Sequence, residues 1–109
     1  MTLTDMTEAM EDDIMQTDTR RSGRPPRITV VGTGYLGATH AVCMATLGFQ
    51  VLGVDVDAAK VDALVDGRVP FHEPGLPQAL DEALSSGRLD FTTDLARAAD
   101  FGDIHFVCV

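Results

Sequence analysis

Residues 28–37 have the sequence ITVVGTGYLG, and this stretch decides the fold. Its first four residues are β-branched, which predicts a strand buried on both faces of a parallel sheet. A GxGxxG pattern follows, and then small and apolar residues at 38–47 predict a helix that Gly48 can end. The glycines of the pattern are Gly32, Gly34 and Gly37. A buried strand, a glycine loop and a helix in direct succession open a dinucleotide-binding unit.

Strand and helix patterns alternate along the rest of the chain. Asp57 is placed to N-cap a helix that Gly67 ends, and Thr93 to N-cap a short helix through Ala99. The other predicted elements are strands at 50–54, 89–92 and 104–109 and a helix from Pro77 to Ser85 or Ser86. With right-handed crossovers, this alternation predicts an α/β fold: a Rossmann-type doubly wound parallel sheet of about four strands in the order 3-2-1-4.

The remaining composition limits where the chain acts and what it binds. Residues 1–26 are polar and charged, which predicts a disordered leader before one dinucleotide-binding domain at 27–109 that is incomplete at its C-terminus. The net charge of −9 argues against nucleic acid or an anionic membrane as partner, so backbone amides would have to hold a phosphate. Cys43 and Cys108 lack metal-site spacing, and the sequence shows neither a membrane span nor a secretory signal. We expect reduced thiols in a cytoplasmic protein.

The glycine loop and the acid after the second strand carry the expected chemistry. The first glycine permits the turn, the second admits a pyrophosphate, and the third brings the helix close to the strand. Asp55 lies 18 residues beyond Gly37, where an acid accepts hydrogen bonds from the adenosine ribose and repels a 2′-phosphate. This predicts NAD rather than NADP as cofactor. Lys60 falls in the first turn of a helix, where the macrodipole disfavours a cation, so it either contacts the cofactor or is an ordinary solvated lysine.

Two further segments are not required by nucleotide binding and resemble one family. GRVPFHEPGL at 67–76 and SGRLDFTTD at 86–94 are similar to the UDP-glucose/GDP-mannose dehydrogenase family. ITVVGTGYLG and VLGVDVDAAKVDAL at 51–64 resemble the same family's opening, and the resemblance runs without interruption over 27–109.

The resemblance implies an NAD-dependent oxidoreductase of nucleotide-sugar metabolism. Such an enzyme oxidises the C6 alcohol of a UDP- or GDP-hexose, with UDP-glucose as the first expectation, to a carboxylate with two NAD. It works through a cysteine-bound intermediate and forms homo-oligomers. The resemblance also implies that Lys60 is a basic cofactor contact and that Val109 begins a cofactor-contacting segment. The predicted cofactor-binding residues are Gly32, Thr33, Gly34, Tyr35, Leu36, Gly37, Asp55, Lys60 and Val109.

No catalytic residue is assigned within the chain. In the resembled family the nucleophilic cysteine lies downstream in a glycine-rich motif that is absent here, so we expect this chain alone not to oxidise a nucleotide sugar. Glu73 is either a general base or part of a turn, because Pro74 and Gly75 follow it. Another Rossmann dehydrogenase, a non-catalytic nucleotide-binding module and an inert truncated fragment remain alternatives. The apolar strand at 104–109 is expected to be an aggregation-prone edge.

Overall fold

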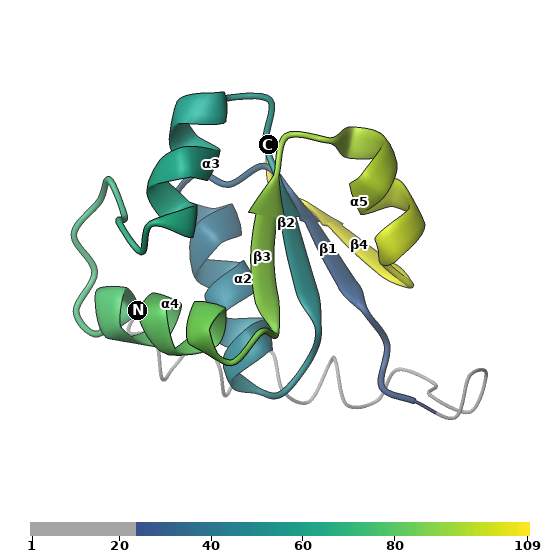
Figure 1. The fold of residues 1–109 in the computed structure, drawn as a ribbon, viewed down its shortest axis with the longest axis horizontal. Helices are drawn as coiled ribbons and strands as arrows, with labels where there is room; N and C mark the ends of the chain where they lie inside the picture. The colour runs from purple at the N-terminus through teal and green to yellow at the C-terminus, as the bar shows by residue number, and fades with distance from the viewer. Residues whose placement is uncertain (1–23) are drawn as a thin grey trace.

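Four short parallel strands form a single sheet in the computed structural model, which describes residues 24–109 (Figure 1). The strands are β1 (Ile28–Val31), β2 (Val51–Val54), β3 (Leu89–Thr92) and β4 (Ile104–Val107). The helices are α2 (Tyr35–Thr46), α3 (Ala58–Val65), α4 (Leu76–Ser85) and α5 (Leu95–Phe101). The order β3-β2-β1-β4, with every pair parallel, confirms the predicted fold class. The leader predicted at 1–26 lies outside the described residues except for its last three.

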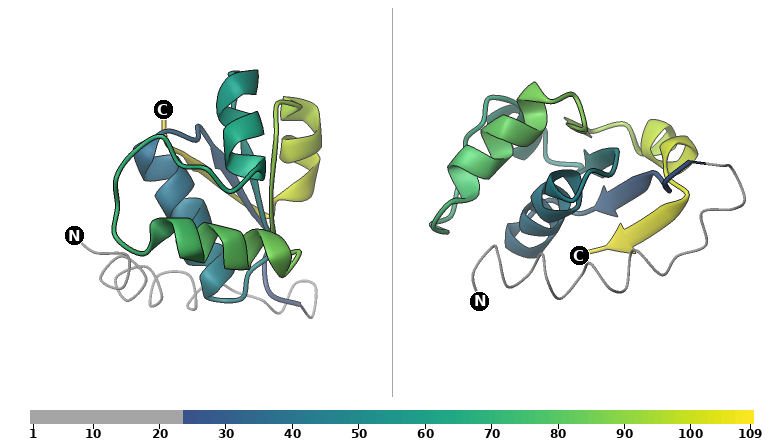
Figure 2. Two further views of the ribbon diagram at one scale, coloured as in Figure 1. Left: turned by 60° about the vertical axis from the view of Figure 1, so that its left-hand side comes forward. Right: turned by 90° about the horizontal axis from the view of Figure 1, so that it is seen from below.

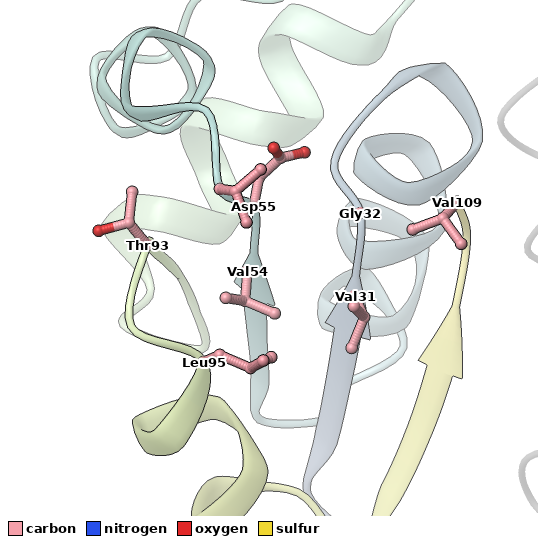
Figure 3. Close-up of a pocket in the computed structure, with 8 residues that line it drawn as sticks. Val31, Gly32, Val54, Asp55, Thr93, Leu95 and Val109 are labelled. Atoms are coloured by element: carbon pink, nitrogen blue, oxygen red, sulfur yellow. The ribbon is translucent and has the colours of Figure 1, made fainter.

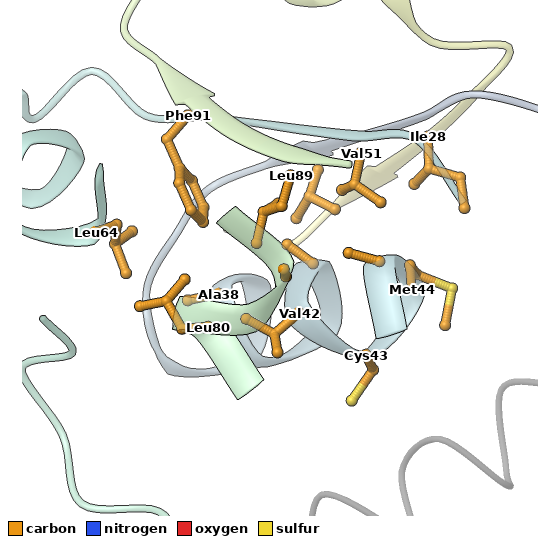
Figure 4. Close-up of a cluster of buried hydrophobic side chains, with 14 of the residues drawn as sticks. Ile28, Ala38, Val42, Cys43, Met44, Val51, Leu64, Leu80, Leu89 and Phe91 are labelled. Carbon is orange, nitrogen blue, oxygen red and sulfur yellow. The ribbon is translucent and has the colours of Figure 1, made fainter. Parts of the chain in front are cut away.

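Helices cover the two faces of the sheet unequally (Figure 2). Residues of α2, α3 and α4 pack against one face and form the larger core, in which Met44, Leu64 and Leu80 are fully buried (Figure 4). Helix α5 covers the other face, where Ala98 packs with Leu52 and other residues of β1 and β2. Because consecutive residues of a strand point to opposite faces, the almost fully buried strands β1 and β2 supply both cores. None of the described helices is both long and apolar enough to cross a membrane.

Three elements have an end that differs from the prediction by two or more residues. Helix α2 begins at Tyr35 instead of residue 38, because the amide of Ala38 donates to the carbonyl of Gly34 (2.9 Å) and the glycine loop itself forms the first turn. Strand β4 ends at Val107 instead of 109. The amide of Cys108 still donates to the carbonyl of Val31 (2.8 Å), but β1 ends there and offers no further partner.

The third difference concerns the start of α5. Thr93 is not its N-cap, because Asp94 takes that position and accepts a hydrogen bond from the amide of Arg97 (3.1 Å). The helix accordingly runs to Phe101 instead of ending at Ala99. Asp57 caps α3 as predicted, by accepting from the amides two and three residues later (3.0 and 3.3 Å).

Candidate functional site

A cleft opens beyond the carboxyl ends of the strands, between the loops that follow them (Figure 3). Its lining residues are Val31, Gly32, Val54, Asp55, Val56, Thr93, Leu95 and Val109. They come from the ends of β1 and β2 and from the segments that follow β3 and β4. The chain crosses from one side of β1 to the other at this place, and such a switch point is where open α/β sheets bind ligands.

The three glycines of the loop have different surroundings. Gly32 has a φ of +96°, and a Cβ there would lie 2.9 Å from the carbonyl oxygen of Cys108. A Cβ on Gly37 would lie 1.7 Å from the carbonyl oxygen of Gly32, so the helix and the loop are in direct contact. A Cβ on Gly34 would meet no described atom within 4 Å. The chain therefore leaves space beside Gly34, while an added Cβ at either of the other two glycines would meet protein atoms.

The N-terminus of α2 offers backbone amides to that space. Gly34 is the N-cap, and no described side chain accepts a hydrogen bond there. The first intrahelical hydrogen bond starts from the amide of Ala38, so the amides of residues 35–37 precede it. These amides and the positive end of the helix dipole form an environment suited to a phosphate. An open cradle with free donors fits a pyrophosphate, and it needs no basic side chain.

Asp55 lies at the end of β2 and is held firmly. Its Oδ2 accepts from the amide and the hydroxyl of Thr33 (2.8 and 3.0 Å), and its Oδ1 accepts from the amide of Asp57 (2.9 Å). Partial burial raises the pKa of the Asp55 carboxyl, but the hydrogen bonds from Asp57 and Thr33, together with the nearby Lys60 charge, outweigh burial. The net effect lowers the pKa, so Asp55 is an anion at neutral pH.

The other predicted site residues occupy different positions around the loop. Thr33 is buried, with its side chain directed to Asp55 and not to the cleft. Lys60 is exposed in the first turn of α3, close enough to Asp55 to lower the pKa of that carboxyl. Tyr35 and Leu36 are exposed at the start of α2 and do not line the cleft, whereas Val109 does. The structure thus brings Gly32, Asp55 and Val109 together at one opening.

Glu73 is buried, and its carboxylate accepts a hydrogen bond from the Tyr35 hydroxyl (2.6 Å). The Tyr35 ring also packs edge-on against Phe71, with the ring centroids 5.0 Å apart. Residues 74 and 75 form the expected turn, and Gly75 is the N-cap of α4 with a φ of +82°. Glu73 therefore connects the loop before α4 to the beginning of α2.

Neither cysteine has the environment of a nucleophile. Cys43 is fully buried in α2 within the larger core. Cys108 is half-buried beneath the glycine loop, and burial raises the pKa of its thiol. A raised pKa keeps a thiol protonated at neutral pH, and the protonated form is a poor nucleophile.

Sequence reasoning missed part of the cleft. Val56 and Leu95 are exposed apolar residues on its rim, and Thr93 follows the carboxyl end of β3. The rule that loops after parallel strands meet at one edge would have indicated Thr93. Nothing in the local pattern distinguishes Val56 or Leu95 from ordinary surface residues.

Comparison with known proteins gives a consistent result. Residues 26–109 match the model of the UDP-glucose/GDP-mannose dehydrogenase family, NAD binding domain. Over 83 residues the chain is 42% identical to the GDP-mannose 6-dehydrogenase of Pseudomonas putida and 42% identical to the UDP-glucose 6-dehydrogenase of Rhizobium meliloti. Each alignment covers 76% of this chain and 19% of the relative, so the chain spans about a fifth of their length. The solved structure of a UDP-glucose dehydrogenase from the archaeon Pyrobaculum islandicum superposes with a TM-score of 0.76 at 41% identity, covering 84% of this chain and 21% of that one.

Proposed function

Because the chain belongs to the UDP-glucose/GDP-mannose dehydrogenase family, we propose that it forms the cofactor-binding part of an enzyme that oxidises a nucleotide-linked hexose. NAD is the cofactor of the matched domain, and it supplies the hydride acceptor. The proposed reaction converts the C6 hydroxyl of a UDP- or GDP-hexose to a carboxylate. That conversion takes one oxygen atom from water and removes two hydride equivalents, and it therefore reduces two NAD.

One observation supports the cofactor assignment most directly: Gly34 faces open space at the start of a helix whose first amides have no intrahelical partner. We assign the pyrophosphate to these amides, which belong to Tyr35, Leu36 and Gly37. The adenosine ribose is assigned to Asp55, because this residue lines the cleft beyond the glycine loop. Val109, which lines the cleft, and Lys60, whose charge acts on Asp55, are proposed as further contacts.

Asp55 should make the site prefer NAD over NADP. An anionic carboxylate accepts hydrogen bonds from ribose hydroxyls and repels a 2′-phosphate. Replacing Asp55 with Ala should weaken NAD binding about tenfold or more, since a hydrogen bond to a charged group contributes roughly 1.5–3 kcal/mol. NADP binding should change less, so the difference between the affinities for NAD and NADP should become smaller.

Calorimetry with NAD and NADP on the wild-type chain and on Asp55→Ala measures both affinities. Asp62→Ala is a matched control, because it removes an exposed carboxylate of α3 outside the cleft. Equal or tighter binding of NADP by the wild-type chain would contradict the assignment of Asp55 to the ribose.

The proposed oxidation of a nucleotide sugar requires a chimeric enzyme for its test. Residues 26–109 would replace the corresponding segment of the Pseudomonas putida GDP-mannose 6-dehydrogenase, and NADH absorbance would be followed with GDP-mannose. We expect turnover, and we expect it to fall when Asp55→Ala is introduced. A folded chimera that binds NAD but yields no NADH would count against the proposal. UDP-glucose is the second substrate to assay, because relatives of both names are equally identical to the chain.

A further inference from the structure

The carboxylate of Asp55 has most of its hydrogen-bonding capacity taken up by the chain itself. A carboxylate has about four acceptor positions, two on each oxygen. Both positions on Oδ2 are filled, by the amide and the hydroxyl of Thr33, and one position on Oδ1 is filled by the amide of Asp57. Among the donors of the described residues none fills the fourth position. A ligand hydroxyl in the cleft therefore has one acceptor position available, and it is on Oδ1.

The Thr33 hydroxyl is the donor in this arrangement that depends on the side chain. Two of the three donors are backbone amides, and any residue at their positions would supply them. The hydroxyl comes from a side chain that is 1% exposed, so water cannot replace it. Without it, the carboxylate keeps one amide donor on each oxygen instead of three donors in all, so Oδ2 is held by a single bond and the carboxylate is held less firmly.

We infer that Thr33 is a positioning residue that holds the Asp55 carboxylate with Oδ1 presented to the adenosine ribose, and that it thereby sets the preference for NAD over NADP. This inference rests on the proposed function, since it takes the ribose to be the ligand of Asp55. It changes the expected role of Thr33. The side chain acts on the cofactor through Asp55 and does not itself touch the cofactor.

The first test compares Thr33→Val with Thr33→Ser by calorimetry. Valine has nearly the shape of threonine but no hydroxyl, and serine keeps the hydroxyl. We expect the Val variant to bind NAD roughly tenfold more weakly, with NADP affinity changed less than about twofold, as for a lost hydrogen bond to a charged acceptor. The Ser variant should keep the wild-type ratio of NAD affinity to NADP affinity. If Thr33 had a purely structural role, its loss would weaken the binding of both cofactors equally. An unchanged ratio of the two affinities in the Val variant would therefore overturn the inference.

The second test needs no cofactor. The titration of the Asp55 side chain, followed by carbon NMR of its carboxyl group, reports directly on the Thr33 hydrogen bond. The charges of Asp57 and Lys60 are present in both variants, so their influence on this titration is common to all samples. We expect the Asp55 pKa to rise in the Val variant and to stay near the wild-type value in the Ser variant. An Asp55 pKa that is the same in the Val and Ser variants would overturn the inference.

The two measurements separate this inference from the proposed function. A wild-type chain that is folded by circular dichroism but binds neither cofactor would refute the proposed function. The NMR titration then decides about Thr33: a rise in the Val variant alone supports its hold on Asp55, and no rise overturns it.

Discussion

Gly34 and Gly37 are three positions apart in the same loop, and the structure gives them opposite roles. A Cβ on Gly37 would overlap the backbone carbonyl of Gly32, so Gly37→Ala must displace the loop from the helix. We expect it to lower the free energy of unfolding by about 2 kcal/mol or more, in the range of overpacked cores, and to abolish NAD binding. Gly34→Ala should leave the unfolding free energy nearly unchanged and weaken NAD binding, because its methyl group enters the space assigned to the pyrophosphate.

Urea denaturation and calorimetry on both variants check this contrast. Gly48→Ala is a useful third variant, because its cost has a different origin: φ is +107° and no described atom lies near the added Cβ. It should lose stability without losing affinity per folded molecule. A Gly34→Ala protein that binds NAD as tightly as the wild type would remove the main support for the cofactor site.

For single residues, the sequence indicates the type of side chain needed at a site better than it indicates where that side chain points. Asp55 was predictable because an acid after the second strand of this unit has a geometric reason to be there. The side-chain direction of Thr33 was not predictable, because it depends on the backbone path of the loop. That path begins where long-range backbone hydrogen bonds hold the chain, from the amide of Gly32 to the carbonyl of Val54 (2.8 Å) and from the amide of Cys108 to the carbonyl of Val31 (2.8 Å).

Between elements, the hydrogen bond from Tyr35 to Glu73 joins the start of α2 to the loop before α4. The hydrogen bond to Glu73, with burial and the Glu73 charge adding to it, raises the pKa of the Tyr35 hydroxyl above its ordinary value of 10.0. The hydroxyl must be protonated to donate. Its stabilising contribution is therefore complete below about pH 10 and is lost as the pH rises through the raised value.

We accordingly expect wild-type protein and Tyr35→Phe to differ in their urea midpoints at neutral pH and to converge in strongly alkaline solution. Glu73→Gln keeps an acceptor but removes the charge, so the pKa of the Tyr35 hydroxyl should be raised less, and the loss of stability should be smaller and complete at a lower pH than in the wild type. Midpoints measured across the alkaline range in all three proteins decide the matter. A constant difference between wild type and Tyr35→Phe at every pH would mean that the hydroxyl does not contribute through this bond.

The helix boundaries show where the sequence rules for N-caps are sufficient to predict the start of a helix. Asp57 was predictable as a cap because the residue before it, Val56, cannot cap a helix, whereas Thr93 and Asp94 are adjacent and both can. The choice of Asp94 follows from the exit of β3, where the Thr92 hydroxyl accepts from the Asp94 amide (3.0 Å). The Tyr35–Glu73 contact spans 38 residues, and no periodicity in the sequence indicates it.

For the whole molecule, the strand order places β4 at an edge, paired with β1 and with no other described strand. Phe106 faces inward, where it packs on the larger core and lies 4.3 Å from the His40 ring, centroid to centroid. Val107 faces outward and is 69% exposed. An apolar edge strand is a template for pairing with another chain, so we expect the 109-residue chain to self-associate.

Its net charge of −9 opposes association, but exposed charges are screened beyond about 10 Å at 0.1 M salt. Light scattering should therefore increase with ionic strength in the wild type. Val107→Lys should suppress that increase, because it puts a charge on the exposed edge without removing a core contact. Val65→Lys makes the same change of charge on the last residue of α3, which is 47% exposed and away from β4, and it should scatter as the wild type does. A wild-type chain that stays monomeric at high salt, or two lysine variants that behave alike, would show that β4 does not govern association.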